Sequence, residues 1–74
     1  MFYLVIRVFF KGETETHSVE IKNSYRDAQV RFYSIIAADL ANEEITYNAA
    51  YIIDSNGQFR AGQVFDRRTE AEGE

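Results

Sequence analysis

A Ser-His-Asp or Cys-His arrangement in this chain would have to use His17 as its base, because it is the only histidine. Nucleophilic catalysis needs a nucleophile, a base and a third group that orients the base, all within hydrogen-bonding reach. Glu13 and Glu15 lie close to His17 in the sequence, but a histidine beside glutamates is a common arrangement. We therefore interpret His17 as a partly buried histidine on an edge strand, and not as a base or a metal ligand.

Carboxylates are the second set of candidate groups. Asp39 falls on the inner side of a predicted helix near its C-terminal end, and Glu43 and Glu44 follow it. Acid–base chemistry by paired carboxylates needs a concave site in which one member keeps its proton. A single helix on a small sheet offers little concavity, so we interpret these three side chains as solvated charges at a helix end.

Metal binding also finds little support in the residue types. Asp54-Ser55-Asn56-Gly57 begins like a calcium loop but lacks the third acidic position and the distal glutamate of that motif, so we interpret it as a turn. The chain contains no cysteine, and one histidine is a poor basis for a zinc site. The sequence therefore predicts no catalytic residue, no cofactor or metal site and no identifiable small-molecule substrate, and we do not expect an enzyme.

The composition fits one small ordered domain. The chain has 74 residues, of which 46% are hydrophobic and 15% aromatic. A domain of this size buries only about 60% of the surface that its unfolded chain exposes, and such domains usually need an additional source of stability. Disulfides and a thiolate metal site are excluded, so oligomerisation is the remaining option.

Acidic residues are concentrated at the end of the chain. The net charge is −4, and Glu70, Glu72 and Glu74 contribute most of it. We expect one domain over residues 1–68 and a flexible acidic tail over 69–74. A nearly neutral domain with an acidic tail argues against non-specific binding to phosphates.

Two further features bear on the location of the protein and on its last ordered residues. No apolar run approaches the roughly 20 residues of a membrane-spanning helix, and we expect a cytoplasmic protein. Arg67 and Arg68 precede the acidic residues, and we expect them to form local ion pairs of little energetic value.

Residues 2–10 predict a central strand, since almost every side chain in them is β-branched or aromatic. Successive side chains of a strand point to opposite faces. One face would carry Phe2, Leu4, Ile6, Val8 and Phe10, and the other Tyr3, Val5, Arg7 and Phe9. Because the first set is uniformly apolar, we expect it to form the core under a helix.

The following strand is expected over residues 15–22. Gly12-Glu13 suits a two-residue type II′ turn. This turn pairs Val8 with His17, and in the same register it pairs Ile6 with Val19 and Leu4 with Ile21. The alternate positions of the second strand are polar, which is typical of an edge strand.

A helix is expected over residues 25–41. Ser24 followed by Asp27 resembles a capping box. The apolar stripe has spacings of three and four and consists of Tyr25, Ala28, Phe32, Ile35, Ile36 and Leu40.

Two more strands are expected over 48–54 and 58–66, after a connector over 42–47. Two turns fit between them. A two-residue turn at Asn56-Gly57 would pair Ile53 with Arg60, whereas a three-residue loop with Gly57 in the left-handed region would pair Ile53 with Phe59. We prefer the second turn, because it places Tyr51, Ile53, Phe59, Ala61 and Phe65 on one face.

These elements predict an α+β fold of the ββαββ type. The connection through the helix joins two parallel strands and should be right-handed. Placing the first strand between them gives a four-stranded antiparallel sheet in the order 2-1-3-4, with one helix on one face, as a two-layer sandwich.

The side of the sheet away from the helix is the predicted interaction surface. A contiguous apolar patch over adjacent strands is rare on soluble monomers. The predicted surface consists of Tyr3, Val5, Arg7, Phe9, Ile52, Arg60 and Val64.

Three kinds of partner fit this surface. We expect a second copy of the chain first and a different protein second. Single-stranded nucleic acid comes last; its bases would stack on Phe9 and Tyr3, while Arg7, Arg60 and Lys22 hold the phosphates. The fourth alternative is that the C-terminal segment covers the patch.

Three stretches of the chain are distinctive: MFYLVIRVFFKGET at the start, AQVRFYSIIAADLA in the helix and AAYIIDSNGQ before the last strand. Together they resemble a loose group of small uncharacterised proteins encoded in phages, prophages and genomes of gut bacteria. The resemblance covers most of the chain, but its motifs are those of a fold and carry over no catalytic residue. It implies a phage-derived accessory or structural protein.

Overall fold

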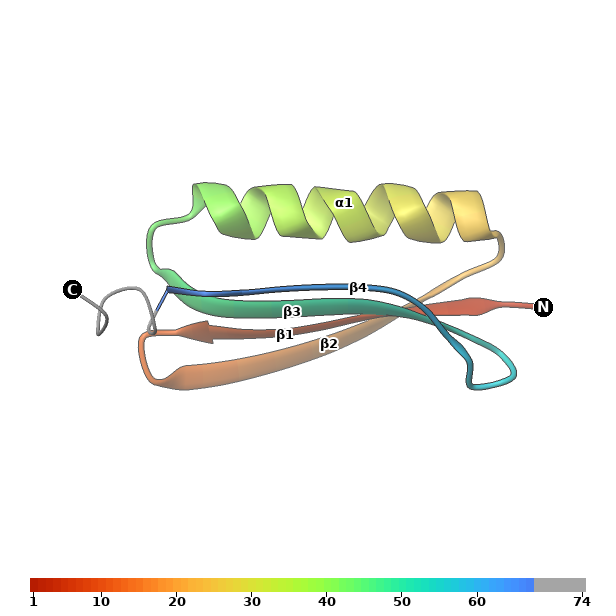
Figure 1. Ribbon diagram of the computed structural model, residues 1–74, viewed down its shortest axis with the longest axis horizontal. Coiled ribbons are helices and arrows are strands. Elements are labelled where there is room, and N and C mark those ends of the chain that lie inside the picture. The colour runs from red at the N-terminus through yellow and green to blue at the C-terminus, as the bar shows by residue number, and fades with distance from the viewer. Residues whose placement is uncertain (68–74) are drawn as a thin grey trace.

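The computed structural model describes residues 1–67. The elements are β1 (Tyr3–Lys11), β2 (Thr14–Lys22), α1 (Tyr25–Ala41), β3 (Ile45–Asp54) and β4 (Phe59–Asp66). The four strands form an antiparallel sheet in the order β2-β1-β3-β4, and α1 lies along one side of it (Figure 1). The predicted α+β fold and strand order are confirmed, whereas the predictions for Arg68 and for the tail over 69–74 fall outside the described residues.

The first hairpin has the predicted register. Lys11 pairs with Thr14 and Val8 pairs with His17. Gly12 has a φ of 65°, while Glu13 does not have a positive φ. A positive φ at the first central position alone is the signature of a type II′ turn, which needs glycine there.

The helix also has the predicted bounds. Ser24 is its N-cap, and the Ser24 hydroxyl accepts a hydrogen bond of 3.1 Å from the backbone N–H of Asp27. Such a bond satisfies one of the backbone donors that a helix start leaves without a partner. Tyr25–Ala41 is too short and too polar to cross a membrane, and residues 1–67 contain no helix that is long and apolar enough to do so.

Strand β3 begins earlier than predicted, at Ile45 instead of residue 48. Ile45 is buried and pairs with Lys11 beyond a register shift after Phe10. The strand start was not predicted because Thr46 and Asn48 are polar and interrupt the apolar pattern at the beginning of β3. Thr46 adds hydrogen bonds from its hydroxyl to the backbone oxygens of Phe10 (3.3 Å) and Gly12 (3.2 Å).

The second hairpin confirms the preferred turn but not the whole register. Gly57 has a φ of 83° and donates its backbone N–H to the oxygen of Asp54 at 2.9 Å, and Ile53 pairs with Phe59 as predicted. A register shift then leaves Arg60 as an extra residue, so that Tyr51 pairs with Gly62. Ala61 and Phe65 therefore point to the helix side as predicted, but they no longer share a face with Tyr51, Ile53 and Phe59, so the prediction of one common face was wrong.

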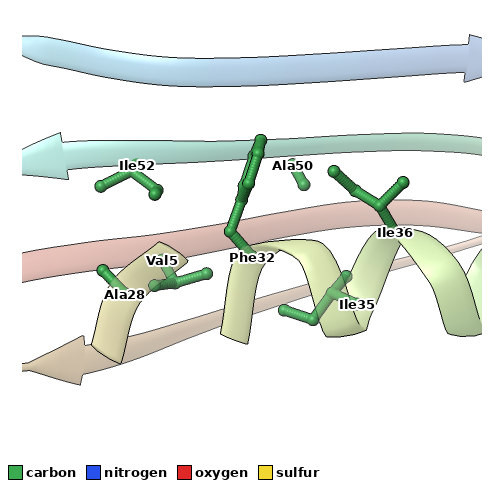
Figure 2. Close-up of a cluster of buried hydrophobic side chains, with 7 residues drawn as sticks. All are labelled: Val5, Ala28, Phe32, Ile35, Ile36, Ala50 and Ile52. Atoms are coloured by element: carbon green, nitrogen blue, oxygen red, sulfur yellow. The ribbon is translucent and has the colours of Figure 1, made fainter. Parts of the chain in front are cut away.

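The core lies on the opposite side of β1 from the predicted one. Val5 packs with helix residues, and the neighbouring strand contributes Ala50 and Ile52 (Figure 2). The buried cluster consists of Val5, Ala28, Phe32, Ile35, Ile36, Ala50 and Ile52. The even-numbered residues of β1 therefore face away from the helix, and the prediction that they form the covered core was wrong.

Candidate interaction surface

Most residues of the predicted interaction surface lie beneath the helix. Val5 and Ile52 are 1% and 0% exposed, and the ring of Tyr3 packs on Tyr25 with centroids 5.4 Å apart. Arg60 also turns to this side, where its guanidinium lies 5.2 Å from the Tyr25 ring centre. Val5, Ile52 and Tyr3 cannot form an open surface, because α1 already covers them, whereas Arg60 stays exposed at the edge of the helix–sheet interface.

Arg7 and Phe9 belong to a polar cluster at the same helix–sheet interface. Arg7 donates hydrogen bonds to Asp39 from Nε (3.0 Å) and Nη2 (2.5 Å), and its guanidinium lies 3.9 Å from the Phe9 ring centre. The interpretation of Asp39 as a solvated charge was wrong, since Asp39 is 2% exposed. Asn48 donates a further hydrogen bond to Asp39 from its side-chain amide, and its Oδ1 has no hydrogen-bond partner among the described residues.

The helix-free side of the sheet, which we call the open face, is assembled from four rows of side chains. Each row crosses the strands in the order β2, β1, β3, β4. The first two rows are Glu15, Phe10, Tyr47, Asp66 and His17, Val8, Ala49, Val64. The last two rows are Val19, Ile6, Tyr51, Gly62 and Ile21, Leu4, Ile53, Phe59. Of the predicted surface residues, only Val64 belongs to this face.

The open face exposes large apolar side chains from both of its edges. Val19 and Ile21 on β2 are 59% and 66% exposed, and Phe59 on β4 is 63% exposed. The central residues Leu4, Ile6 and Val8 are half-buried by their neighbours alone. The face is therefore a second apolar layer without a covering element in residues 1–67 (Figure 1).

Aromatic contacts fix the shape of this face. Phe10 and Tyr47 meet edge to face at 5.5 Å, and Tyr51 and Phe59 do so at 6.2 Å. A Cβ on Gly62 would lie 2.6 Å from the Phe59 ring, so glycine leaves the room in which that ring lies. Edge-to-face aromatic pairs hold their rings in a defined orientation, which favours a surface that is already formed before it binds.

Acidic groups occur only in the first row. Glu15 and Asp66 lie at its two ends, and the imidazole of His17 in the second row hydrogen-bonds with the carboxylate of Glu15. His17 is exposed on the open face, so its interpretation as a partly buried edge residue was wrong. In residues 1–67 no group of three or more acidic, histidine or cysteine side chains could hold a metal ion.

The loop that begins at Asp54 is a turn, as interpreted from its sequence. One carboxylate oxygen of Asp54 accepts backbone N–H groups from Gln58 and Asn56, both at 3.0 Å. These backbone donors, with Arg60 at 3.4 Å from the other oxygen, hold the pKa of Asp54 below its ordinary value. Both oxygens of the Asp54 carboxylate therefore accept hydrogen bonds from within the same hairpin.

The acidic residues with which Arg67 was expected to form ion pairs lie outside the described residues, but the other contacts of Arg67 are described. Its guanidinium donates to the backbone oxygens of Leu40 (2.5 Å), Asn42 (2.8 Å) and Ile45 (3.0 Å). The last carbonyls of a helix lack partners within the helix and carry partial negative charge. Arg67 therefore caps the C-terminal end of α1 from a distant part of the sequence.

Comparisons add no relative to this description. No family model, no curated protein and no solved structure matches the chain. The described residues also enclose no pocket that could hold a small molecule. The open face is thus the candidate functional site, and its physical character is the basis for the proposal below.

Proposed function

We propose that this protein is a small non-catalytic interaction module that self-associates through its open face. The supporting observation is the distribution of apolar side chains between the two sides of the sheet. The covered core contains the small residues Ala28 and Ala50. The bulky residues Leu4, Ile6 and Ile53 lie on the side that no described element covers.

The size of this face suits a protein partner. Four strands spaced about 4.8 Å apart and seven residues of about 3.3 Å each give a projected area on the order of 450 Å². Apolar patches of about 300–600 Å² are the largest on typical monomers and are often functional. A second copy would bring an identical apolar layer, and would supply the additional burial that a chain of this size needs.

Single-stranded nucleic acid is the second candidate for the same face. Phe10, Tyr47 and Tyr51 offer aromatic rings on which bases would stack. Phosphates need cations nearby, and none of the four rows contains a lysine or arginine. We therefore expect no binding of a short oligonucleotide even at low salt; binding that weakens steeply with salt would favour this candidate instead.

A matched pair of variants tests self-association. Val19 on the open face and Val30 on the outer side of α1 are 59% and 61% exposed, so a glutamate at either site stays in contact with water in the monomer. Light scattering after size exclusion should find wild type and Val30→Glu as dimers. Val19→Glu should raise the dissociation constant by at least about tenfold and elute as a folded monomer.

The opposite results are equally informative. A wild type that stays monomeric at high micromolar concentration contradicts self-association and leaves a different protein as the partner. Equal dissociation constants for the two glutamate variants would place the interface elsewhere. The setting we propose for this module is the cytoplasm, or the virion if its resemblance to phage-type proteins reflects common origin.

A further inference from the structure

The helix carries a second row of apolar side chains on its outer side. Val30, Tyr33 and Leu40 are 61%, 62% and 49% exposed, and Ala37 between them is exposed as well. These four positions follow one another at spacings of three, four and three, so they form one stripe along α1, which we call the outer seam. None of them belongs to the buried cluster, and α1 lies on the opposite side of the sheet from the open face (Figure 1).

The surroundings of the outer seam are also unusual for a helix that faces water, because such a surface normally carries charged side chains. Within the described helix residues 30–41, every exposed side chain is uncharged: Val30, Tyr33, Ser34, Ala37, Ala38, Leu40 and Ala41. The half-buried Arg31 lies on the flank towards β2, where it forms an ion pair of 2.8 Å with Glu20. Spacings of three and four are those with which one helix packs along another, so the pattern favours a helix as the element that covers the seam.

We propose that the outer seam binds the outer seam of a second copy, with the two helices antiparallel. Tyr33 and Ala37 are equally far from the midpoint of the stripe, and so are Val30 and Leu40. A two-fold axis across the helices at this midpoint places Tyr33 over the partner's Ala37, and Val30 over the partner's Leu40. The largest side chain of the seam thus meets the smallest, and the stripe is complementary to itself.

Charged groups at the ends of the helix agree with this orientation. Arg26 lies one turn before Val30 on the same side of α1, and Glu43 follows the C-terminal end of the helix. Both are exposed, and neither forms an ion pair within residues 1–67. Antiparallel helices bring Arg26 level with the partner's Glu43, whereas parallel helices would bring it level with the partner's Arg26.

The size of the seam indicates a weak contact. Four side chains that each lose about 100 Å² bury on the order of 800 Å² in the two copies together, which is less than the roughly 1,200 Å² of stable complexes. We expect a dissociation constant on the order of 1 mM, so the protein remains a dimer of the open-face type at micromolar concentration. Because the open face and the outer seam lie on opposite sides of the molecule, both contacts together would join such dimers into longer chains at high concentration.

The variant Val19→Glu, which is designed to disrupt the open face, isolates the outer seam for a test. Its amide chemical shifts should change with protein concentration at seam residues and fit a dissociation constant on the order of 1 mM. Adding Val30→Glu should raise that constant at least about tenfold. Ala38→Glu adds the same charge at an exposed position on the flank towards β2, and should leave the constant unchanged.

Two results would overturn the outer seam without touching the open face, which is tested with the wild-type chain. One is an absence of concentration-dependent shifts along α1 at about 1 mM, and the other is an equal effect of Val30→Glu and Ala38→Glu.

Charge reversal in the same background tests the orientation. Arg26→Glu should raise the dissociation constant about fivefold, because two attractive pairs become repulsive, and Arg26→Glu/Glu43→Arg should restore it. Parallel helices would bring identical charges together in each of these proteins. An unchanged constant for Arg26→Glu would therefore overturn the antiparallel orientation.

Discussion

Arg7 of the central strand and Asp39 of the helix are joined by two hydrogen bonds across the helix–sheet interface. A buried carboxylate needs a cation and hydrogen-bond donors, since its transfer out of water is otherwise too costly. The helix therefore has to cover the side of β1 that carries Arg7. The more uniformly apolar side is left as the open face, and so one ion pair is linked to the position of the proposed interface.

We expect Arg7→Met to lower the free energy of unfolding by about 3 kcal/mol, because it leaves Asp39 buried without its cation. The double variant Arg7→Met/Asp39→Leu should recover most of this loss and remain about 1 kcal/mol below wild type, because Asn48 loses its acceptor. Urea unfolding at one fixed protein concentration measures both values. Simple addition of the two single effects would contradict a direct coupling.

Acid should destabilise the protein partly through Asp54. The pKa of Asp54 is lowered in the folded state by the backbone donors of Gln58 and Asn56. The stabilisation is therefore complete above the ordinary value of 3.8 and is lost as the pH falls through the lower, folded-state pKa. Asp54→Asn should flatten this part of a stability–pH curve, whereas the exposed Glu43→Gln should leave it unchanged.

Loss of the helix cap should be measurable with a pair of serine variants. Ser24→Ala should cost about 1 kcal/mol, because the Asp27 N–H loses its acceptor. Ser34→Ala changes an exposed serine inside the same helix and should cost nothing, since alanine favours helix more than serine does. Thermal unfolding of the two proteins provides the comparison, and equal losses would rule out a specific capping role.

The contact of Arg67 with the end of α1 predicts an asymmetry between the two helix ends. Arg67→Ala should destabilise the protein by about 1 kcal/mol, because the carbonyls of Leu40 and Asn42 at the helix end, and that of Ile45 in β3, lose a charged donor. Arg26→Ala removes an exposed arginine from the first turn, where a cation opposes the helix dipole, and should be neutral or stabilising. Amide hydrogen exchange should localise the effect of Arg67→Ala to the last turn of α1; uniform faster exchange would contradict the capping interpretation.

Turn chemistry made much of the fold predictable. Gly12 and Gly57 mark the turns of the two hairpins, and Ser24 marks the helix start. These signals act over a few residues, so the sequence contains them directly. The pairing of β3 with β4 beyond Arg60 was not predicted, because Arg60 is a bulged residue. Its position depends on contacts with Asp54 and Tyr25 that only the folded chain brings together.

The candidate site was assigned to the wrong side because apolar content was used to choose the covered face of β1. Two other expectations already fixed that choice. A two-residue turn makes Lys11 and Thr14 a hydrogen-bonded pair, and such pairs recur at every second residue, through Phe9 and Arg7. The crossover starts from β2, passes over β1 and ends in β3. For L-amino acids and a right-handed crossover, the residues of β1 that are hydrogen-bonded to β2 must face the helix. The inward position of Asp39 pointed to the same answer.

The pairing of β1 with β3 also has a consequence for the way in which the chain folds. Both hairpins and the helix form from local contacts, but Tyr3 pairs with Asp54, which lies near the other end of the described chain. Closing that pair costs loop entropy over the intervening hairpin and helix, so docking of the two hairpins should limit the folding rate. Until they dock, the inner edges of β1 and β3 are unpaired and open to other chains. Refolding yield should therefore fall as protein concentration rises, also for Val19→Glu, which is designed to remove the proposed self-association.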